Sequence, residues 1–569
     1  MAAMRAGVDN LNLTEQEDQL ELERPESEVE SEKFTIRLNG QKDLEQRLRE
    51  FKAACDAHEK HARRRRKRRY YHMGLLAKVV METTHEELRR MLEHGTYTFH
   101  VDMVAFKPDE LVTILETLNI AISAHADERE LRTVTGLALE INGDCCRVGR
   151  LRNNCTTMLA RGSVVTLTTN EAYRYAGFRE IVYVINLSAY LSSIRLNDVL
   201  LIGREVRCRV VKTLNEAVAV LIIDAGILSS YDFIELPRQC HSLAPSLYPQ
   251  LYQADLQAAA ALKANFVVLP KIRCKSFLRA VRMTITTEFD MKLIGCIDFE
   301  YVRTNMLDLL GIIKLLDYIW IPDMFNVNCC VYNYIMEDAL PIAQCQKKPV
   351  IGTVPLERCN DFKRFELHEF LWKIDTIHMQ KSPWCNKYPL IVKKLMPIRD
   401  YRVGVVQTHQ QVKSILTSYQ TIVNFIIRTI ATIECQAIFV FTKCETASVA
   451  LARSEIYCPV YLMMPLNDDD DEFTIKCKFD LARALHLRRN THPIIYTPDL
   501  NECNYSPIEF GVDYMRRKGC LEVGDFVVTL EVGKEDEENI VLGIGEDVCI
   551  LRAFYVAPVF NCEKFKYGT

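Results

Sequence analysis

Short apolar runs alternate with amphipathic segments over residues 70–143, and this alternation is the first structural signal in the chain. The run from Thr133 to Ile141 is mostly apolar, as expected for a strand that is buried on both faces. Asn142-Gly143-Asp144 follows it, and these residue types favour a tight turn. The pattern also predicts strands at 74–80 and 97–104 and helices at 84–93 and 108–122. Strands that alternate with helices in this way predict a parallel α/β architecture.

The same alternation returns after residue 237. Taken together, the two segments fit eight strands with intervening helices, so we predict one (β/α)8 TIM barrel built from residues 70–143 and 237–402. Glu140 lies near the carboxyl end of a predicted strand, where such barrels place their active-site groups. In the second segment we expect strands at 264–269, 291–297, 318–322 and 349–354, and helices at 256–263, 277–286 and 306–315.

Two further regions have a different pattern. Residues 144–236 are rich in Val, Thr, Ile and Leu in short runs without a long helical period, which predicts a small all-β insertion into the barrel. Residues 403–569 again mix helical and strand patterns and are expected to form a separate carboxy-terminal α/β domain. The run of four aspartates from Asp468 to Asp471 is expected on a surface loop of that domain.

Residues 1–69 lack the apolar content of a packed domain. The first 60 residues are polar and acidic, and we expect them to be largely disordered. They end in the basic run Arg63–Arg69. This run fits a nuclear-import or anionic-surface signal, and it equally fits a solvated arm that pairs with the acidic leader, so both interpretations stay open.

Composition and charge narrow the function classes. At 569 residues the chain is too long for one core, and its hydrophobic (49%) and charged (26%) fractions are those of a soluble globular protein. A net charge of -4 gives no reason to expect nucleic acid as the main partner, and no segment is apolar enough to predict a membrane span. The 21 cysteines include no C-x-x-C pair, and no signal-peptide pattern opens the chain. We therefore expect reduced thiols in a cytoplasmic protein.

The segment that leaves the third predicted barrel strand resembles a known family. Residues 138–149 align without a gap with the A-L-D-T-K-G-P-E-I-R-T-G of pyruvate kinases, in which a barrel strand leads into a small lid domain. The identical residues are Ala138, Leu139, Gly143, Arg147 and Gly149. The resemblance covers roughly residues 70–569 and is specific in domain order, although weak in identity. It implies that residues 144–236 form the β-barrel lid.

The resemblance also implies a reaction and its cofactors. Pyruvate kinases are kinases of glycolysis that transfer a phosphoryl group from phosphoenolpyruvate to ADP, yielding ATP. The family works as tetramers and uses Mg²⁺ and K⁺. Phosphoryl transfer needs cations that neutralise the transferred group and carboxylates that hold those cations. If active, this chain would therefore bind phosphoenolpyruvate, ADP or ATP, Mg²⁺ and K⁺.

Several catalytic positions of the family carry other residues here. In the strand that matches I-S-K-I-E, Cys296 takes the place of the lysine and Asp298 takes the place of a magnesium-binding glutamate. The second magnesium-binding position, an aspartate in the family, falls on Phe325, with Asp323 two residues away. The threonine near the proton-transfer site falls on Val354. Thr353 is adjacent to Val354, but neighbouring strand residues point to opposite faces.

The substrate and potassium positions are changed as well. His100 takes the place of a substrate-binding arginine, and the potassium site keeps at most Asp102 and Glu140. Two arginines of the family survive as Arg147 and Arg273. Each of these fits either a phosphate-facing role or a structural ion pair, and the sequence leaves both possibilities open.

These substitutions lead to three hypotheses. The first is a pyruvate kinase-family pseudoenzyme that keeps the fold and assembles with itself or with active relatives as a regulatory or structural subunit. The second is an active but divergent pyruvate kinase that uses Asp298, Arg147 and Arg273. The third is an adaptor that acts through the basic run Arg63–Arg69.

Overall fold

We describe the fold from a computed structural model. The residues that it describes are 73–93, 95–127, 134–237, 243–322, 329–353, 370–371, 373–380, 426, 435–442, 458–467, 469–497, 507–517, 520–534, 543–544 and 547–556. The predicted acidic leader and the basic run Arg63–Arg69 lie outside these residues.

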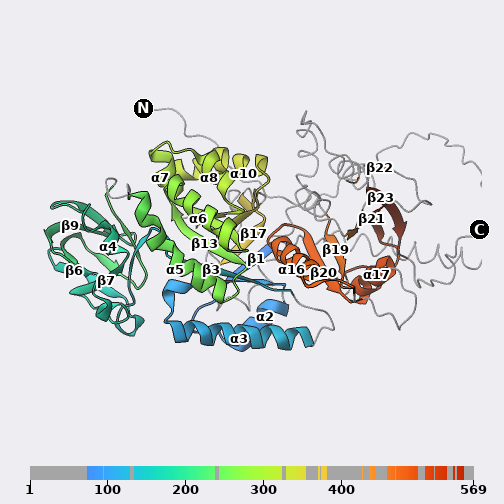
Figure 1. The fold of residues 1–569 in the computed structure, drawn as a ribbon, viewed down its shortest axis with the longest axis horizontal. Coiled ribbons are helices and arrows are strands. Elements are labelled where there is room, and N and C mark those ends of the chain that lie inside the picture. Colours follow the sequence, from blue (N-terminus) through green and yellow to red (C-terminus); the bar gives the residue numbers. More distant parts are fainter. Residues whose placement is uncertain are drawn as a thin grey trace, which may run out of the picture. The chain divides into compact units, whose positions relative to one another are not determined.

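Eight parallel strands close into a barrel, which we call the large barrel (Figure 1). Its strands follow one another in the order β1-β2-β3-β13-β14-β15-β16-β17, and β17 pairs with β1 to close the ring. The predicted α/β architecture is therefore confirmed. The strands are β1 (Gly74–Lys78), β2 (Thr98–Asp102), β3 (Gly136–Glu140), β13 (Phe266–Ile272), β14 (Lys292–Ile297), β15 (Tyr318–Ile321), β16 (Val350–Thr353) and β17 (Thr376–Met379).

Strand β17 was not recognised in the sequence. It has only four residues, and Thr376 and His378 interrupt its apolar run. Both side chains are nevertheless buried, at 0% and 2% exposure. A polar residue in the barrel interior finds its partners on distant strands, so local hydrophobic periodicity does not reveal it.

Helices cover the outside of the large barrel, and the main core lies between these helices and the strands. A second core fills the interior of the barrel and includes Leu76, Phe266, Ile294, Tyr318 and Ile351. These strand residues alternate with residues that face the helices, as the period of two requires. The helices are α2 (His85–Glu93), α3 (Pro108–Asp127), α5 (Tyr248–Ala261), α6 (Lys275–Glu288), α7 (Phe299–Thr304), α8 (Leu309–Leu315), α9 (Cys329–Tyr334) and α10 (Leu340–Cys345).

A second closed barrel of seven strands, the small barrel, is inserted between β3 and β13. Its core is separate from that of the large barrel, in agreement with the predicted all-β insertion. It also carries the short helix α4 (Leu187–Tyr190) and a two-stranded ribbon of β5 (Thr157–Leu159) and β11 (Gly226–Leu228). The barrel strands are β4 (Cys146–Val148), β6 (Val164–Thr168), β7 (Ile181–Ile185), β8 (Val199–Ile202), β9 (Val206–Thr213), β10 (Ala217–Asp224) and β12 (Phe233–Glu235).

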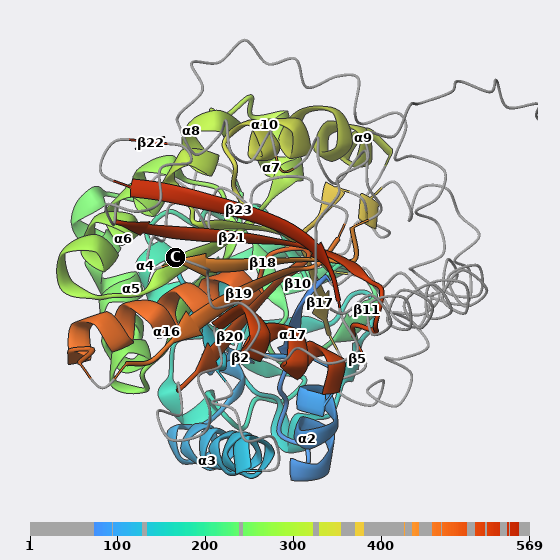
Figure 2. The ribbon, with the colours of Figure 1, turned by 90° about the vertical axis from the view of Figure 1, so that its right-hand side faces the viewer.

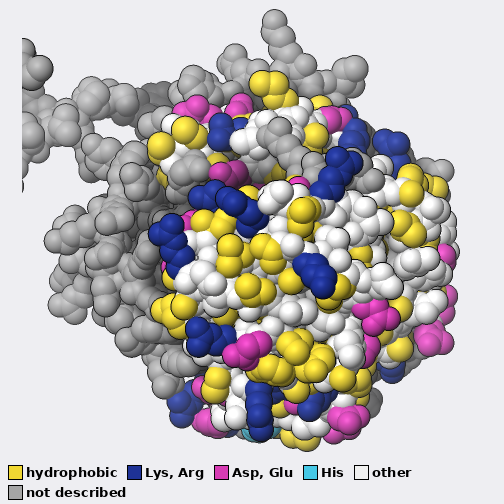
Figure 3. Space-filling view, turned by 90° about the vertical axis from the view of Figure 1, so that its left-hand side faces the viewer, with side chains coloured by type: hydrophobic (Ala, Val, Ile, Leu, Met, Phe, Trp, Pro, Cys, Tyr) yellow, Lys and Arg dark blue, Asp and Glu magenta, His cyan; other side chains and the backbone are white. Residues whose placement is uncertain are grey.

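The outer face of the small barrel mixes apolar and basic side chains (Figure 3). Val199, Arg209, Leu221 and Val164 are Cα partners in one row across β8, β9, β10 and β6. Val164 and Val199 are among the exposed large hydrophobic residues of the chain. The barrel is closed, so this surface presents side chains rather than unpaired strand edges.

The carboxy-terminal region contains a six-stranded mixed sheet in the order β20-β19-β18-β21-β23-β22 (Figure 2). Its two faces carry separate apolar cores, which include residues of α16 (Glu472–His486) and of α17 (Pro507–Arg517). Asp469–Asp471, part of the predicted surface loop, precede α16, and Asp471 caps that helix. The strands are β18 (Ala437–Thr442), β19 (Val460–Pro465), β20 (Thr491–Tyr496), β21 (Phe526–Lys534), β22 (Gly543–Ile544) and β23 (Asp547–Tyr555).

Over the described ranges, no helix combines the length and the apolar character that are needed to cross a bilayer.

Candidate functional site

The candidate site lies at the carboxyl ends of the large-barrel strands, where the small barrel joins. The predicted turn after β3 is present: Gly143 has φ +60°, and the Cys145 N–H donates to the carbonyl of Asn142. The chain passes from this turn directly into β4 of the small barrel. Side chains from β2 and β3 are thereby brought next to side chains from β4.

A chain of buried hydrogen bonds crosses the interior of the large barrel at this end. Trp320 Nε1 donates to Thr353 Oγ1 at 2.8 Å, and Thr353 Oγ1 lies 3.2 Å from His378 Nδ1. His378 Nε2 lies 3.2 Å from His100 Nδ1, and His100 Nε2 lies 3.0 Å from Glu140 Oε2. The indole N–H can only donate, so Thr353 Oγ1 is the acceptor in the first of these hydrogen bonds.

His100 and His378, the two histidines in this series of hydrogen bonds, are buried. Burial, together with the neighbouring charges of His100 and Lys78, holds the pKa of His378 well below its usual range. The indole ring of Trp320 lies 4.4 Å from the His378 ring and 5.1 Å from the His100 ring, measured between centroids. Both ring nitrogens of each histidine are engaged, so these side chains fill the barrel interior and offer no free donor to a ligand.

Arg147 of β4 pairs with the two carboxylates at the ends of β2 and β3. Its Nη1 donates to Asp102 Oδ2 at 3.0 Å, and its Nη2 donates to Glu140 Oε1. The guanidinium also lies over the Phe233 ring, 4.2 Å from the centroid. Burial alone would raise the pKa of Glu140, but the charge of Arg147 and the hydrogen bond to His100 lower it well below its usual range. Glu140 is therefore a carboxylate at neutral pH.

A second ion-pair cluster surrounds Arg273, just beyond β13. Arg273 Nε donates to Asp298 Oδ2 at 2.7 Å, and its Nη2 donates to Glu235 of β12. Glu235 also accepts from Lys271, whose ammonium lies 4.5 Å from the Phe233 ring centroid. Lys271 has φ +44° at a register irregularity in β13. Such an irregularity re-aims side chains, and here it directs both cations toward Glu235.

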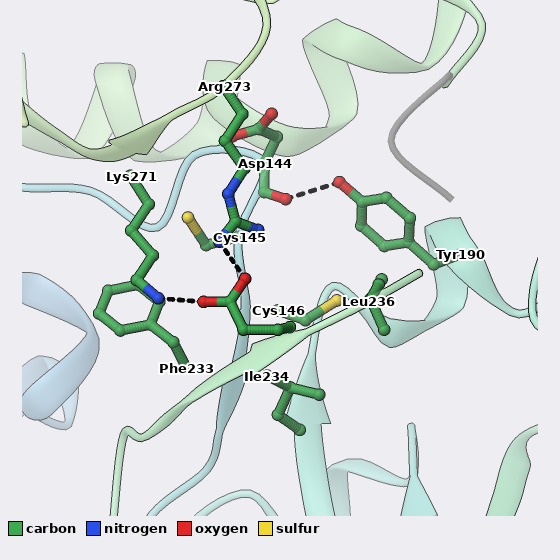
Figure 4. Close-up of a pocket in the computed structure, with 10 residues that line it drawn as sticks. Asp144, Cys145, Cys146, Tyr190, Phe233, Ile234, Leu236, Lys271 and Arg273 are labelled. Carbon is green, nitrogen blue, oxygen red and sulfur yellow. Dashed lines mark hydrogen bonds and ion pairs between the residues drawn. The ribbon is translucent and has the colours of Figure 1, made fainter. Parts of the chain in front are cut away.

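The Arg273 cluster borders a small cavity at the junction of the two barrels (Figure 4). The cavity holds about 20 Å³, room for about one water molecule. Asp144 lies on its wall, and the Tyr190 hydroxyl donates to the Asp144 carbonyl at 2.6 Å. Burial raises the pKa of the Asp144 carboxyl to about 6. The positive charge of Arg273 opposes this rise but is the smaller effect.

Replacing Asp144 by asparagine is expected to stabilise the protein at pH 8. The folded state favours the protonated carboxyl, so the stability due to Asp144 is present below the unfolded pKa of about 4 and is lost as pH rises through about 6. Denaturant unfolding should show Asp144→Asn more stable by about 2–3 kcal/mol at pH 8 and nearly equal to the wild type at pH 4. An equal difference at both pH values would count against this assignment.

The structure places some of the predicted residues together and leaves others undescribed. Asp102, Glu140, His100 and Arg147 form one cluster, and Asp298 and Arg273 belong to the other. Phe325, Val354 and Asp323 lie outside the described residues.

Cys296 carries no charge in this setting. It lies on β14 against the interior core of the large barrel, and burial raises the pKa of its thiol to about 12. The Cys296 thiol is therefore neutral at physiological pH. Thr353 was not predicted to be a site residue. In the structure it is 1% exposed and is hydrogen-bonded to Trp320 and His378.

Sequence reasoning missed Trp320, His378, Glu235 and Lys271. Trp320 was predicted only as part of an apolar strand, and His378 lies on the strand that was not predicted. Glu235 and Lys271 belong to different barrels and meet through folding. The sequence offered one signal for these residues, namely polar side chains near the ends of predicted strands. Side chains alternate between the two faces of a strand, so every second one of them points into the barrel interior.

The described residues do not fit the metal ions that the resemblance implies. Among them, no group of three or more His, Cys, Asp or Glu side chains is arranged to hold a metal ion. Asp102, Glu140 and Asp298 are each engaged by an arginine. Mg²⁺ and K⁺ both need oxygen atoms that are free to coordinate.

Comparisons with known proteins add no relative. No protein-family model matches the chain, and no curated protein matches it.

Proposed function

We propose that this protein is a pyruvate kinase-like chain that has lost phosphoryl transfer and serves as a non-catalytic subunit. The observation that carries the proposal is the pairing of both surviving arginines with carboxylates of the protein itself. Arg147 is bonded to Asp102 and Glu140, and Arg273 is bonded to Asp298 and Glu235. A cation that is already neutralised inside the protein has little remaining attraction for a transferring phosphoryl group.

The loss of the lysine supports the same proposal. Cys296 stands at its position as a neutral thiol. Removal of one preorganised charge stabiliser typically costs about 100- to 1000-fold in rate, and removal of several is not additive. Together with two neutralised arginines, the missing ammonium leaves a barrel mouth that is poorly equipped for phosphoryl transfer.

The cavity beside Arg273 is itself too small for a substrate. Ligand pockets usually enclose about 300–1,000 Å³, whereas the cavity beside Arg273 holds about 20 Å³. Contacts across the junction hold the small barrel in place. Arg150 Nη1 donates to Glu110 at 2.8 Å, and the Tyr231 hydroxyl donates to the Ala105 carbonyl at 3.0 Å.

The domain order is consistent with the family. A TIM barrel with a small β-barrel lid inserted after its third strand and an α/β domain at the carboxyl end is the arrangement that the resemblance implies. The eight-stranded barrel, the inserted seven-stranded barrel and the six-stranded sheet occur in this order along the chain. A fold does not determine a catalytic activity, so this domain order supports a relationship to the family and not a kinase activity.

The competing proposal is an active but divergent pyruvate kinase. It needs Arg147, Arg273 and Asp298 to turn from their present partners toward phosphoenolpyruvate, nucleotide or Mg²⁺. Breaking these pairs would leave buried carboxylates without a counter-charge, which is costly. Binding energy from substrate and metal would have to compensate that cost, and a binding measurement can detect it.

Purified protein should show almost no turnover with phosphoenolpyruvate, ADP, Mg²⁺ and K⁺. Relative to a working pyruvate kinase assayed in parallel, we expect a rate at least about 1000-fold lower, because the lysine is replaced and both arginines are neutralised. Calorimetry with phosphoenolpyruvate and Mg²⁺ should show no binding heat at millimolar concentration. The working kinase, added to the same sample, must remain active as a control. Turnover that depends on both Mg²⁺ and K⁺ would overturn the proposal.

A further inference from the structure

We infer that the outer face of the small barrel is a docking surface for a protein segment in which carboxylates stand between aliphatic side chains (Figure 3). Four neighbouring strands, β8, β9, β10 and β6, form this surface. We call it the outer sheet face, and its main residues are Val164, Val199, Arg207, Arg209, Leu221 and Ile223. The inference goes beyond the proposed function and does not depend on it, because the small barrel would carry the same surface in an active enzyme.

Strand β10 is apolar on both of its faces. It reads Ala-Val-Ala-Val-Leu-Ile-Ile-Asp, and its inward residues Val218, Val220 and Ile222 belong to the small-barrel core. Leu221 and Ile223 alternate with them and so point outward, where both remain half-buried. A strand with water on one side normally carries polar residues there, whereas an apolar run is typical of a strand that is covered on both faces. This pattern indicates that a partner covers the outer side of β10.

Neighbouring strands extend the apolar surface and place a cation within it. Val199, Arg209, Leu221 and Val164 are Cα partners in one row across β8, β9, β10 and β6. Val164 is 53% exposed and Val199 is 42% exposed. Within the part of the chain that the structure describes, Arg209 makes no hydrogen bond and no ion pair. The row therefore presents a guanidinium without a carboxylate, with aliphatic side chains on both sides of it.

A second arginine of β9 lies on the same side of the strand as Arg209. Arg207 is two positions away, so the Cα atoms of the two arginines are about 6.6 Å apart. Arg207 contacts Asp224 at 3.5 Å, but these side chains are 59% and 48% exposed, and water screens the pair. A carboxylate of a partner can therefore replace Asp224. Guanidinium groups bind such carboxylates through two parallel hydrogen bonds.

The two arginines define the chemistry of the partner. Carboxylates four positions apart on an α-helix are separated by about 6 Å along its axis, which matches the spacing of Arg207 and Arg209. Aliphatic side chains beside these carboxylates would pack on Leu221 and Val164 on one side and on Val199 on the other, and so remove them from water. The outer sheet face thus fits an amphipathic helix with acidic residues at i and i+4 between leucine-like side chains.

Other occupants fit this surface less well. The small barrel is closed, so a partner cannot add a strand to its edge. A second copy of the chain, packed through the same face about a two-fold axis, would bring the arginines of both copies together, and like charges repel. Sheets that bind single-stranded nucleic acid stack bases on aromatic side chains, whereas the residues of the outer sheet face are aliphatic or basic.

The test measures binding of a designed helical peptide to the full-length protein by fluorescence anisotropy. The peptide carries glutamates at i and i+4 between leucines, and a second peptide carries lysines in place of the glutamates. The wild type should bind the acidic peptide at least about tenfold more tightly than the basic peptide. Arg209→Glu should weaken binding of the acidic peptide at least about tenfold, because it removes a cation and adds a repelling carboxylate. The double variant Arg207→Glu/Arg209→Glu should reverse the preference and bind the basic peptide more tightly.

Arg152→Glu is the matched control. Arg152 is an exposed arginine of the small barrel outside the outer sheet face, so the same change of charge there should alter the dissociation constant by less than about twofold. Leu221→Gln tests the apolar contact and should weaken binding of the acidic peptide at least about tenfold. If Leu221→Gln lowers the Tm of the protein, Val164→Gln provides the same test, because Val164 is 53% exposed and lies outside the core.

Four results would overturn the inference. The first is no binding of the acidic peptide at about 1 mM, and the second is equal binding of both peptides. The third is tighter binding of an oligonucleotide or of anionic vesicles than of the acidic peptide, lost in Arg209→Glu, which would assign the face to phosphate groups. The fourth is a dimer that Arg209→Glu dissociates, which would assign the face to a second copy. Turnover with phosphoenolpyruvate and ADP would defeat the proposed function but leave this inference intact.

Discussion

Replacing Arg147 by methionine is expected to destabilise the protein by about 3–5 kcal/mol at pH 7.5, the usual cost of removing one partner from a buried ion pair. Methionine roughly preserves the volume of the arginine side chain but removes the charge that compensates Asp102 and Glu140. Both carboxylates are buried, so neither can recover the lost interaction from water. Denaturant unfolding at pH 7.5 gives the free energy directly.

The matched control is Arg150→Met. Arg150 also joins the small barrel to the large barrel, through Glu110, but both side chains of this pair are 22% exposed and water screens the pair. Pairs near the surface typically contribute about 0–1 kcal/mol. The difference between the variants should shrink toward acid pH, because protonation of Glu140 removes the uncompensated charge. Equal costs for Arg147→Met and Arg150→Met would show that the Arg147 cluster is not a buried ion pair.

Replacing Trp320 by alanine should cost about 3–5 kcal/mol, as large-to-small changes of buried aromatic residues do. The indole fills the mouth of the large barrel, where it packs on His378 and His100 and is 7% exposed. Its removal also takes away the hydrogen bond that Thr353 Oγ1 accepts at 2.8 Å. Urea unfolding of the full-length protein, with the wild type in parallel, measures the loss.

Trp320→Phe separates packing from hydrogen bonding. Phenylalanine keeps a ring next to the two histidines but cannot donate to Thr353, so its cost should be about 1–3 kcal/mol, clearly below that of alanine. If alanine cost less than about 1 kcal/mol, the barrel mouth would be open or loosely packed. That outcome would show that the interior of the large barrel is not packed around Trp320 as described.

The arrangement at the barrel mouth differs from a site that awaits a substrate. Catalytic groups are usually preorganised toward a space where charge develops. Here the charged groups are directed toward one another, and the histidines are bonded in series. The same scaffold can thus place polar residues at strand ends, as α/β barrels do, while Arg147 and Arg273 pair with carboxylates of their own chain.

Local sequence features determined much of the fold. Alternating strands and helices predicted the large barrel, the Val- and Thr-rich segment predicted the all-β insertion, and Asn142-Gly143-Asp144 predicted the turn between them. These features are local: periodic burial and turn chemistry depend on residues a few positions apart.

The tertiary structure decided which charges meet. His100 and His378 are 278 positions apart, and Arg147 and Asp102 are 45 apart. Their pairing depends on barrel closure, on the register of β2 against β3, and on the return of the small barrel beside the strand ends. Because an ion pair forms wherever folding places opposite charges, residue type alone left the roles of Arg147 and Arg273 open. The three-dimensional arrangement turned both of them inward, toward carboxylates of their own chain.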